Sequence, residues 1–286
     1  MFIYFIMLVQ SLIASGTHIV AKVVVRDIEP VTLTMIRSGI AALGLCVLGY
    51  LRREKFHYKR EHIKSILFLS FLVIPVNQFL FLTAIKYTTP TNAALFYSTT
   101  PAVVIVMSTI MGKEKLQLMR GMGIMIAFIG VSLIIFEKGI DFSSEYMIGN
   151  MLLVVAVLAW AYYTVQGRSL VLEYGAFSIS ISTMVIGTLM FIPIGVIGMA
   201  QYDYSVLTIG HWGGLLYLAL GTSIVAYLIW YYALSRTTAS KVAIFSNLQP
   251  VLTTILAWGL IGQQITAVFI IGGIIVICGI VITQYS

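Results

Sequence analysis

The sequence predicts an all-α integral membrane protein of ten transmembrane helices, arranged as two inverted five-helix repeats. Three observations predict this fold: the composition, the number of apolar runs, and a motif that recurs after 149 residues. The chain is 60% hydrophobic and 9% charged, whereas soluble domains carry roughly 25% charged residues. A water-soluble core cannot hide this much apolar surface, so we expect the lipid bilayer to be the solvent.

The apolar runs give the number of helices. A helix that crosses the hydrocarbon needs about 20 mainly apolar residues. Such runs lie at 3–25, 31–51, 64–85, 91–111, 118–136, 147–167, 177–199, 212–234, 240–261 and 265–283. The first run lacks the basic leading segment of a secretory signal, so we interpret it as a retained helix. The two cysteines fall inside apolar runs and predict neither a disulfide framework nor a metal site.

The basic residues predict the orientation. With the N-terminus in the cytoplasm, the linkers on the inside hold twelve Lys and Arg, Arg168 among them, and the linkers on the outside hold four. This positive-inside bias places both termini in the cytoplasm. The net charge of +7 therefore reflects membrane topology, and we expect no nucleic-acid partner.

The repeated motif divides the chain into two copies. Residues 94–106 read ALFYSTTPAVVIV and residues 243–255 read AIFSNLQPVLTTI, with Ala, Phe and Pro in the same order and spacing. We expect one repeat at 1–138 and a second at 139–286. Because each copy has five spans, an odd number, the second must enter the membrane from the opposite side. Inverted repeats of this kind are the signature of alternating-access carriers.

The chain resembles the drug/metabolite transporter superfamily, specifically its EamA-type members. The resemblance rests on Lys22, on Pro30 followed by Arg37, on TTPTNAALFYSTTP at 88–101, on the Gly-Lys-Glu turn at 112–114 and on the Gly123/Gly130 spacing. It implies a multi-pass carrier of the bacterial inner membrane, often an exporter of amino acids or other small metabolites. The second copy has Gly262-Gln263-Gln264 where the family has an acidic turn, so a role for that acid is not carried over.

Polar residues inside apolar runs mark the candidate site, because a polar cluster facing lipid would be costly. Pro101 and Pro250 are the predicted helix kinks, since each removes a backbone donor and its ring clashes with the preceding turn. The polar side chains beside them either satisfy the kinks alone or line a substrate cavity. The candidate substrate-binding residues are His18, Asn77, Gln78, Tyr97, Ser98, Trp160, Tyr163, Tyr227, Trp230, Ser246, Asn247 and Gln249.

The charged residues leave three interpretations open. His18 is either a coupling or substrate group or a hydrogen-bonded interior residue. Lys22 and Arg37, placed towards the outer ends of their helices, bind a substrate carboxylate, reach the headgroups or pair within the bundle. All ten carboxylates fall in linkers or at span ends. Glycine stripes in the fifth and tenth runs are typical of close helix packing, within a monomer or at a homodimer seam.

These features predict a secondary transporter that moves small organic metabolites by alternating access. The predicted substrate is a small molecule, an amino acid or a related neutral or zwitterionic compound. No nucleophile, metal-ligand or paired-carboxylate pattern lies in the spans, so we expect no enzyme, no metal site and no cofactor. No phosphate-binding loop of an ATP-driven pump occurs. The alternative is a membrane scaffold or lipid-handling protein without flux of small solutes.

Overall fold

The computed structural model describes residues 2–115, 117–136, 144–261 and 266–285, and all the regular structure in those ranges is helical. Up to residue 136 the helices are α1 (Phe2–Val24), α2 (Pro30–Leu51), α3 (Arg60–Phe71), η1 (Leu72–Gln78), α4 (Phe79–Tyr87), α5 (Pro90–Ser98), α6 (Thr100–Ile110) and α7 (Leu118–Phe136). From residue 144 they are α8 (Ser144–Tyr174), α9 (Ala176–Gln201), η2 (Tyr204–Val206), α10 (Ile209–Leu216), η3 (Tyr217–Ala226), α11 (Tyr227–Leu234), α12 (Ala239–Ala243), η4 (Ile244–Asn247), α13 (Leu248–Ile261) and α14 (Ala267–Tyr285).

Several of these helices join end to end into longer stretches that could cross a membrane. Eight stretches are long and apolar enough: Phe2–Val24, Pro30–Leu51, Arg60–Tyr87, Asn92–Ile110, Met147–Tyr174, Ala176–Gln201, Ile209–Leu234 and Ala267–Tyr285. A shorter apolar helix covers Leu118–Leu133. The multi-pass membrane class is therefore confirmed, while ten spans in two inverted repeats stay a prediction.

Two helices extend furthest beyond their predicted bounds. The helical stretch predicted at 64–85 begins at Arg60. The stretch predicted at 147–167 continues to Tyr174, so Arg168 lies in a helix and not in a linker. The extension is stabilised by packing, because Leu170 and Val171 in the added turns are both 2% exposed. Arg168 itself donates from Nε to the carbonyl oxygen of Thr237, 2.8 Å away.

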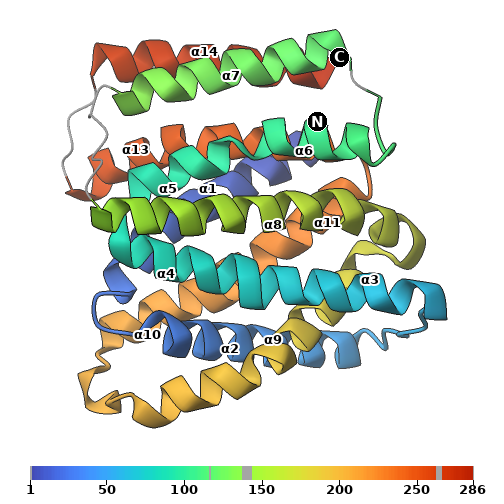
Figure 1. Cartoon of the computed structure of the whole chain (residues 1–286), viewed down its shortest axis with the longest axis vertical. Coiled ribbons are helices and arrows are strands. Elements are labelled where there is room, and N and C mark those ends of the chain that lie inside the picture. Colours follow the sequence, from blue (N-terminus) through green and yellow to red (C-terminus); the bar gives the residue numbers. More distant parts are fainter. Residues whose placement is uncertain (1, 116, 137–143, 262–265, 286) are drawn as a thin grey trace.

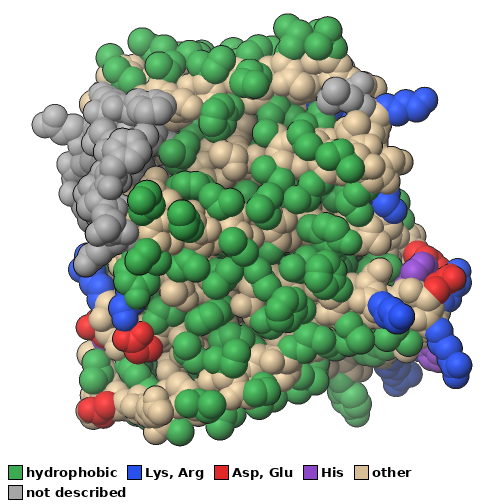
Figure 2. Space-filling view, viewed as in Figure 1, with side chains coloured by type: hydrophobic (Ala, Val, Ile, Leu, Met, Phe, Trp, Pro, Cys, Tyr) green, Lys and Arg blue, Asp and Glu red, His purple; other side chains and the backbone are tan. Residues whose placement is uncertain are grey.

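The surface shows the belt expected of a membrane protein. In Figure 2 hydrophobic side chains cover the broad middle of the visible face, and charged side chains gather at its left and right edges. Many large apolar side chains are exposed along this belt, Leu43 at 71% and Ile110 at 80% among them. A soluble protein rarely exposes a continuous apolar patch beyond a few hundred Å². The belt is the surface that lipid chains would cover.

The helices α7 and α14 form a close pair at the top of the view in Figure 1. Glycines allow the two backbones to approach closely. A Cβ added at Gly130 would lie 2.6 Å from the Gly272 carbonyl oxygen, and one added at Gly279 would lie 2.5 Å from the Gly123 carbonyl oxygen. Such distances leave no room for any side chain. The glycine spacing read from the sequence therefore serves packing within the chain.

Candidate functional site

A cavity in the interior of the bundle is the candidate functional site. It holds about 570 Å³ that no protein atom fills, its opening included. The residues that line it are Gln10, Ala14, Thr17, His18, Arg37, Asn77, Gln78, Phe81, Tyr97, Trp160, Thr222, Ala226, Tyr227, Trp230 and Gln249. Nine of these precede residue 100 and six follow residue 150, so both parts of the chain build the cavity.

Two π-helical segments bring side chains to this cavity in the described part of the chain. A π-helix is wider than an α-helix because its hydrogen bonds skip one more residue, and such turns are frequent at functional sites. The segment η1 contributes Asn77 and Gln78, and η3 contributes Thr222 and Ala226. Pro75 lies inside η1, where its missing N–H breaks the α-helical ladder. Shifted by 149 residues, η1 would overlap η3.

Aromatic rings form one wall of the cavity. The ring of Trp160 packs against those of Tyr227 and Trp230, with centroids 5.1 Å apart in both pairs. Behind them Tyr163 stacks on Trp160 at 5.4 Å and on Tyr231 at 4.8 Å. Each such pair stabilises the fold by about 0.5–1.5 kcal/mol beyond the area it buries. The rings therefore support one another, and they present an apolar aromatic surface to a ligand.

His18 lies in the cavity lining and connects α1 with α13. Its Nε2 and the Oε1 of Gln249 are 2.9 Å apart. The imidazole also meets the rings of Phe81 and Tyr97 edge-on, at 5.5 and 5.8 Å. Its Nδ1 is buried without a hydrogen-bond partner in the protein. The hydrogen bond fits the interpretation of His18 as an interior residue, and the unpaired Nδ1 leaves a polar atom available to a ligand.

Asn77 ties three helices together at the edge of the cavity. Its Nδ2 donates to the hydroxyl of Tyr97 and to the carbonyl oxygen of Ala156, both at 2.8 Å. Its Oδ1 accepts a long hydrogen bond of 3.5 Å from the Tyr227 hydroxyl. Because Asn77 bonds to two aromatic hydroxyls, we infer that it orients the rings of Tyr97 and Tyr227.

Arg37 is the charged residue of the cavity lining. Its side chain comes from the first half of α2, and the residue is 2% exposed. The guanidinium Nε donates to the carbonyl oxygen of Leu218 at 3.1 Å and to the hydroxyl of Ser223 at 2.9 Å, both in η3. The Nη1 atom has no partner in the protein. No carboxylate is among the described residues that line the cavity.

The structure places eight of the twelve predicted substrate-binding residues in the lining: His18, Asn77, Gln78, Tyr97, Trp160, Tyr227, Trp230 and Gln249. The other four lie outside it. Ser98 donates to the carbonyl oxygen of Leu95 at 2.6 Å, and the hydroxyl of Tyr163 lies 3.0 Å from that of Thr183. Ser246 and Asn247 are buried, at 1% and 0% exposure. A role in binding stays a prediction for all twelve.

Four polar lining residues were not among the candidates: Gln10, Thr17, Arg37 and Thr222. For three of them the sequence held a signal. Gln10, Ala14, Thr17 and His18 follow the spacing that places side chains on one face of a helix. Arg37 was considered only as a residue that either binds a substrate carboxylate or reaches the headgroups or pairs within the bundle, although its position seven residues after the start of α2 at Pro30 places it inside the span. For Thr222 we find no signal beyond its place in the second copy.

Both predicted kinks are breaks in the helix. The helix α5 ends at Ser98 and α6 begins at Thr100, with Pro101 in its first turn. At the other proline a 3₁₀ segment, η4, separates α12 from α13, and Pro250 is the third residue of α13. A proline in the first turn of a helix is tolerated because its missing N–H would have no partner there. The backbone thus avoids the clash by starting a new helix at each proline.

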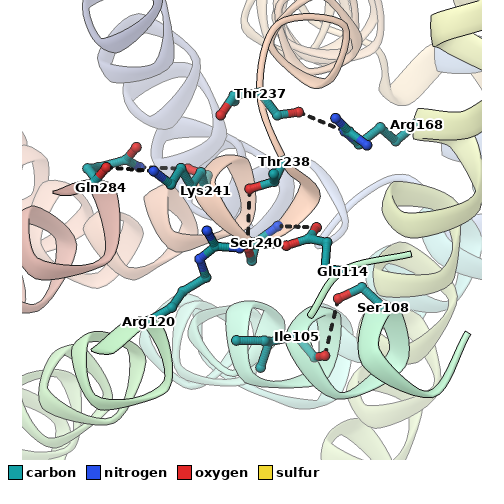
Figure 3. A network of polar contacts seen from close by, with 10 residues as sticks. All are labelled: Ile105, Ser108, Glu114, Arg120, Arg168, Thr237, Thr238, Ser240, Lys241 and Gln284. Atoms are coloured by element: carbon teal, nitrogen blue, oxygen red, sulfur yellow. Dashed lines mark hydrogen bonds and ion pairs between the residues drawn. The ribbon is translucent and has the colours of Figure 1, made fainter. Parts of the chain in front are cut away.

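A buried polar network holds the beginning of α12 (Figure 3). The carboxylate of Glu114, in the turn after α6, accepts hydrogen bonds from the backbone N–H and the hydroxyl of Ser240, at 3.2 and 2.5 Å. Arg120 of α7 lies 3.0 Å from the same carboxylate. The two charged side chains are only 7% and 5% exposed. A buried ion pair from the first part of the chain therefore holds Ser240 of the second part through hydrogen bonds.

Comparison with protein families gives one match over nearly the whole chain. The model of the EamA-like transporter family matches residues 1–136 and again residues 147–285. The second match includes 262–264, the turn where an acid was expected, which lies outside the described residues. The family matches on both sides of a short unmatched stretch.

Individual relatives cover the full length as well. The "Uncharacterized transporter YyaM" of Bacillus subtilis is 31% identical over 97% of this chain and 92% of its own. An uncharacterized transporter of Archaeoglobus fulgidus is 29% identical over 98% and 96%. A WAT1-related protein of Arabidopsis thaliana is 27% identical over 97% and 77%. One solved crystal structure has the same fold, with a TM-score of 0.81, 16% identity and coverage of 98% and 96%.

Proposed function

Because this chain belongs to the EamA-like transporter family, we propose that it is a secondary transporter that exports amino acids or related neutral or zwitterionic metabolites by alternating access. Its relatives are transporters and not enzymes, and it is a multi-pass membrane protein. The substrate class, the export direction and the alternating-access cycle are the parts we propose.

The observation that carries the proposal is the cavity shared by both parts of the chain. Alternating-access carriers bind substrate between two repeats, often where helices are broken. Here Tyr97 reaches the cavity from α5, just before one break, and Gln249 reaches it from α13, just after the other. The aromatic wall shares this space with amide and imidazole groups. Such a lining fits a small molecule with an apolar body and a polar end.

The proposed membrane placement follows from charge. Basic residues gather at the end of the bundle that holds residues 52–60, and the positive-inside rule places such linkers in the cytoplasm. We propose a bacterial inner membrane with both termini on the cytoplasmic side. The first residues of α1 and the last residues of α14 lie in the same upper right part of Figure 1, which supports termini on one side.

Counterflow in liposomes tests the transport function. Purified protein is reconstituted with a high concentration of one amino acid inside, and uptake of the labelled compound is followed. We expect saturable uptake that disappears without protein. If no solute in a panel of amino acids and related metabolites shows saturable flux, the scaffold or lipid-handling alternative holds instead.

A matched pair of tryptophan variants tests the site. Trp230 lines the cavity at 1% exposure, whereas Trp258 is 54% exposed on the apolar belt. We expect Trp230→Ala to weaken the apparent affinity about tenfold, since one lost aromatic contact removes about 1–1.5 kcal/mol. Trp258→Ala should leave transport unchanged. Equal transport by both variants, at equal amounts of monodisperse protein, would remove the aromatic wall from the site.

A further inference from the structure

Arg37 is a buried positive charge without a carboxylate partner among the described residues. The other buried arginine among the described residues, Arg120, pairs with Glu114. Arg37 instead lies within the apolar bundle and lines the cavity. A guanidinium does not lose its proton in a protein. A charge at this depth is costly, and charges kept within spans mark ligand and ion pathways.

The neighbouring π-helix fixes the direction of this side chain. The segment η3 frees the carbonyl oxygen of Leu218, which accepts from Arg37 Nε at 3.1 Å and from the Ser223 hydroxyl at 3.1 Å. The Ser223 hydroxyl also contacts Arg37 Nε at 2.9 Å. Both contacts engage Nε and leave Nη1, on the outer edge of the guanidinium, without a partner. The fork that binds a planar anion is therefore held in place but only partly used.

Two amide oxygens of the same cavity also lack partners. Gln10 Oε1 and Gln78 Oε1 are buried without a hydrogen bond in the protein. Both residues line the cavity with Arg37. Buried acceptors of this kind are normally paired. The cavity thus offers one unpaired cationic donor, two unpaired neutral acceptors, and an aromatic wall.

We propose that Arg37 binds the carboxylate of the transported molecule, and that the substrates are small organic carboxylates with an apolar or aromatic body. The inference rests on the proposed transport function and names the substrate class of that site. The Arg37 guanidinium pairs with the carboxylate, the aromatic wall of Trp160, Tyr227 and Trp230 takes the body, and the Gln10 and Gln78 oxygens accept from an ammonium group when one is present. Because those acceptors are neutral, losing the carboxylate weakens binding more than losing the ammonium.

Three probes of one shape test this assignment: phenylalanine, phenylalaninamide, which lacks the carboxylate, and 3-phenylpropanoate, which lacks the ammonium. Binding to the purified protein is followed by the fluorescence of Trp160 and Trp230, which line the cavity. Counterflow is measured in parallel. We expect the amide to bind at least tenfold more weakly than phenylalanine. The affinity for 3-phenylpropanoate should fall less than the affinity for the amide.

Variants separate recognition from folding. Arg37→Gln should weaken phenylalanine binding at least tenfold and leave amide binding unchanged, and Arg37→Lys should fall between. Arg168→Gln is the matched control, because Arg168 donates to a backbone carbonyl and does not line the cavity. If Arg37→Gln does not fold, Arg37→Lys and Ser223→Ala, which removes one contact of Nε, are compared with the wild type on the same probes.

The outcomes are distinct. If Arg37 only braces η3, the variants lower thermal stability while the ratio of acid to amide binding stays at its wild-type value, and the proposal is overturned. If solutes without a carboxylate show saturable flux and those with one do not, the transport function is supported and the proposed role of Arg37 is contradicted. If no solute of any charge is transported, the proposed function falls, and the carboxylate assignment falls with it.

Discussion

The two proline-broken helices share a sequence motif, yet they solve the same structural problem differently. In the first copy the break between α5 and α6 is a single residue, Thr99. In the second copy four residues form the 3₁₀ segment η4 between α12 and α13. The same proline position therefore gives a sharp break once and an extended one once. The polar residues before each proline account for the difference.

At the break between α5 and α6, neighbouring hydroxyls pair with the backbone carbonyl oxygens. The hydroxyls of Ser98 and Thr99 donate to the carbonyl oxygens of Leu95 and Phe96, at 2.6 and 2.7 Å. In the second copy the hydroxyl of Ser246 and both polar atoms of the Asn247 side chain are buried without a partner. One break is therefore closed by its own side chains, and the other keeps buried polar groups without partners in the protein.

The beginnings of the two helices differ as well. At α5 the Thr89 side chain accepts from the backbone N–H of Asn92, as a helix N-cap does. At α12 the equivalent residue, Thr238, makes no capping bond. Instead, the carboxylate of Glu114, in the turn after α6, accepts a hydrogen bond from the Ser240 N–H. A local neutral cap in one copy is replaced by a long-range charged one in the other.

The largest expected effect comes from breaking that charged cap. Glu114→Gln removes the negative charge opposite Arg120 while keeping the side-chain shape. We expect the free energy of unfolding to fall by about 3–5 kcal/mol, because removing one partner leaves the other charge buried. Thermal unfolding of the protein in detergent measures the change.

An exposed ion pair at the opposite end of the bundle provides the control. Lys86 and Glu29 lie 2.7 Å apart, with side chains 39% and 66% exposed. Glu29→Gln should cost less than about 1 kcal/mol, because surface pairs gain little in water. Equal losses in the two variants would show that burial of the Glu114 pair does not distinguish the two helix starts.

The charged cap also shows what the sequence could not predict. The apolar runs could be found in the sequence because a membrane span is a local stretch of apolar residues. The recurring proline motif could be found because the same residues occur twice in the same order and spacing. The ion pair joins Glu114 and Arg120, which are close in the sequence, but Glu114 also accepts from Ser240 of α12, and no local pattern links Ser240 to either of them. The Gly-Lys-Glu turn could be noticed in the sequence, but its partner Ser240 comes from the packing of distant helices.

The candidate site was predictable to the extent that its residues are unusual in apolar runs. His18, Asn77 and Gln249 were found because polar groups in lipid are costly. Polarity alone does not say which way a side chain points, so Asn247 was grouped with Gln249 although only Gln249 lines the cavity. The π-helical turns were not predicted, because a shift in hydrogen-bond register leaves little mark beyond Pro75.

The next effect concerns the unpaired groups at the second break. Asn247→Ala should lower transport about tenfold, because we expect the Asn247 amide to find its partners when the bundle changes conformation. The free energy of unfolding should change by less than about 1 kcal/mol, since losing a buried but unpaired amide offsets the lost packing. Counterflow and thermal unfolding of the same preparation measure both.

The first break provides the comparison for this variant. Ser98 bonds only to its own helix, so Ser98→Ala should cost about 0.5–1 kcal/mol of stability and leave transport unchanged. Normal counterflow by Asn247→Ala would show that the two breaks are equivalent in transport. A loss of several kcal/mol in that variant would instead indicate that Asn247 holds this conformation together.

The smallest effect distinguishes the two helix caps. Thr89→Ala removes the side-chain oxygen that accepts from Asn92 N–H, so we expect a loss of about 1 kcal/mol in the free energy of unfolding. Thr238→Ala should cost less than half of that, because the Thr238 side chain contacts only the Ser240 hydroxyl, at 3.3 Å, and Glu114 already accepts from the Ser240 N–H. In a Glu114→Gln background the difference between the two threonines should shrink, since the α12 start then lacks its charged acceptor. If Thr238→Ala costs as much as Thr89→Ala with Glu114 intact, the local cap operates in both copies and the contrast between them is limited to the breaks.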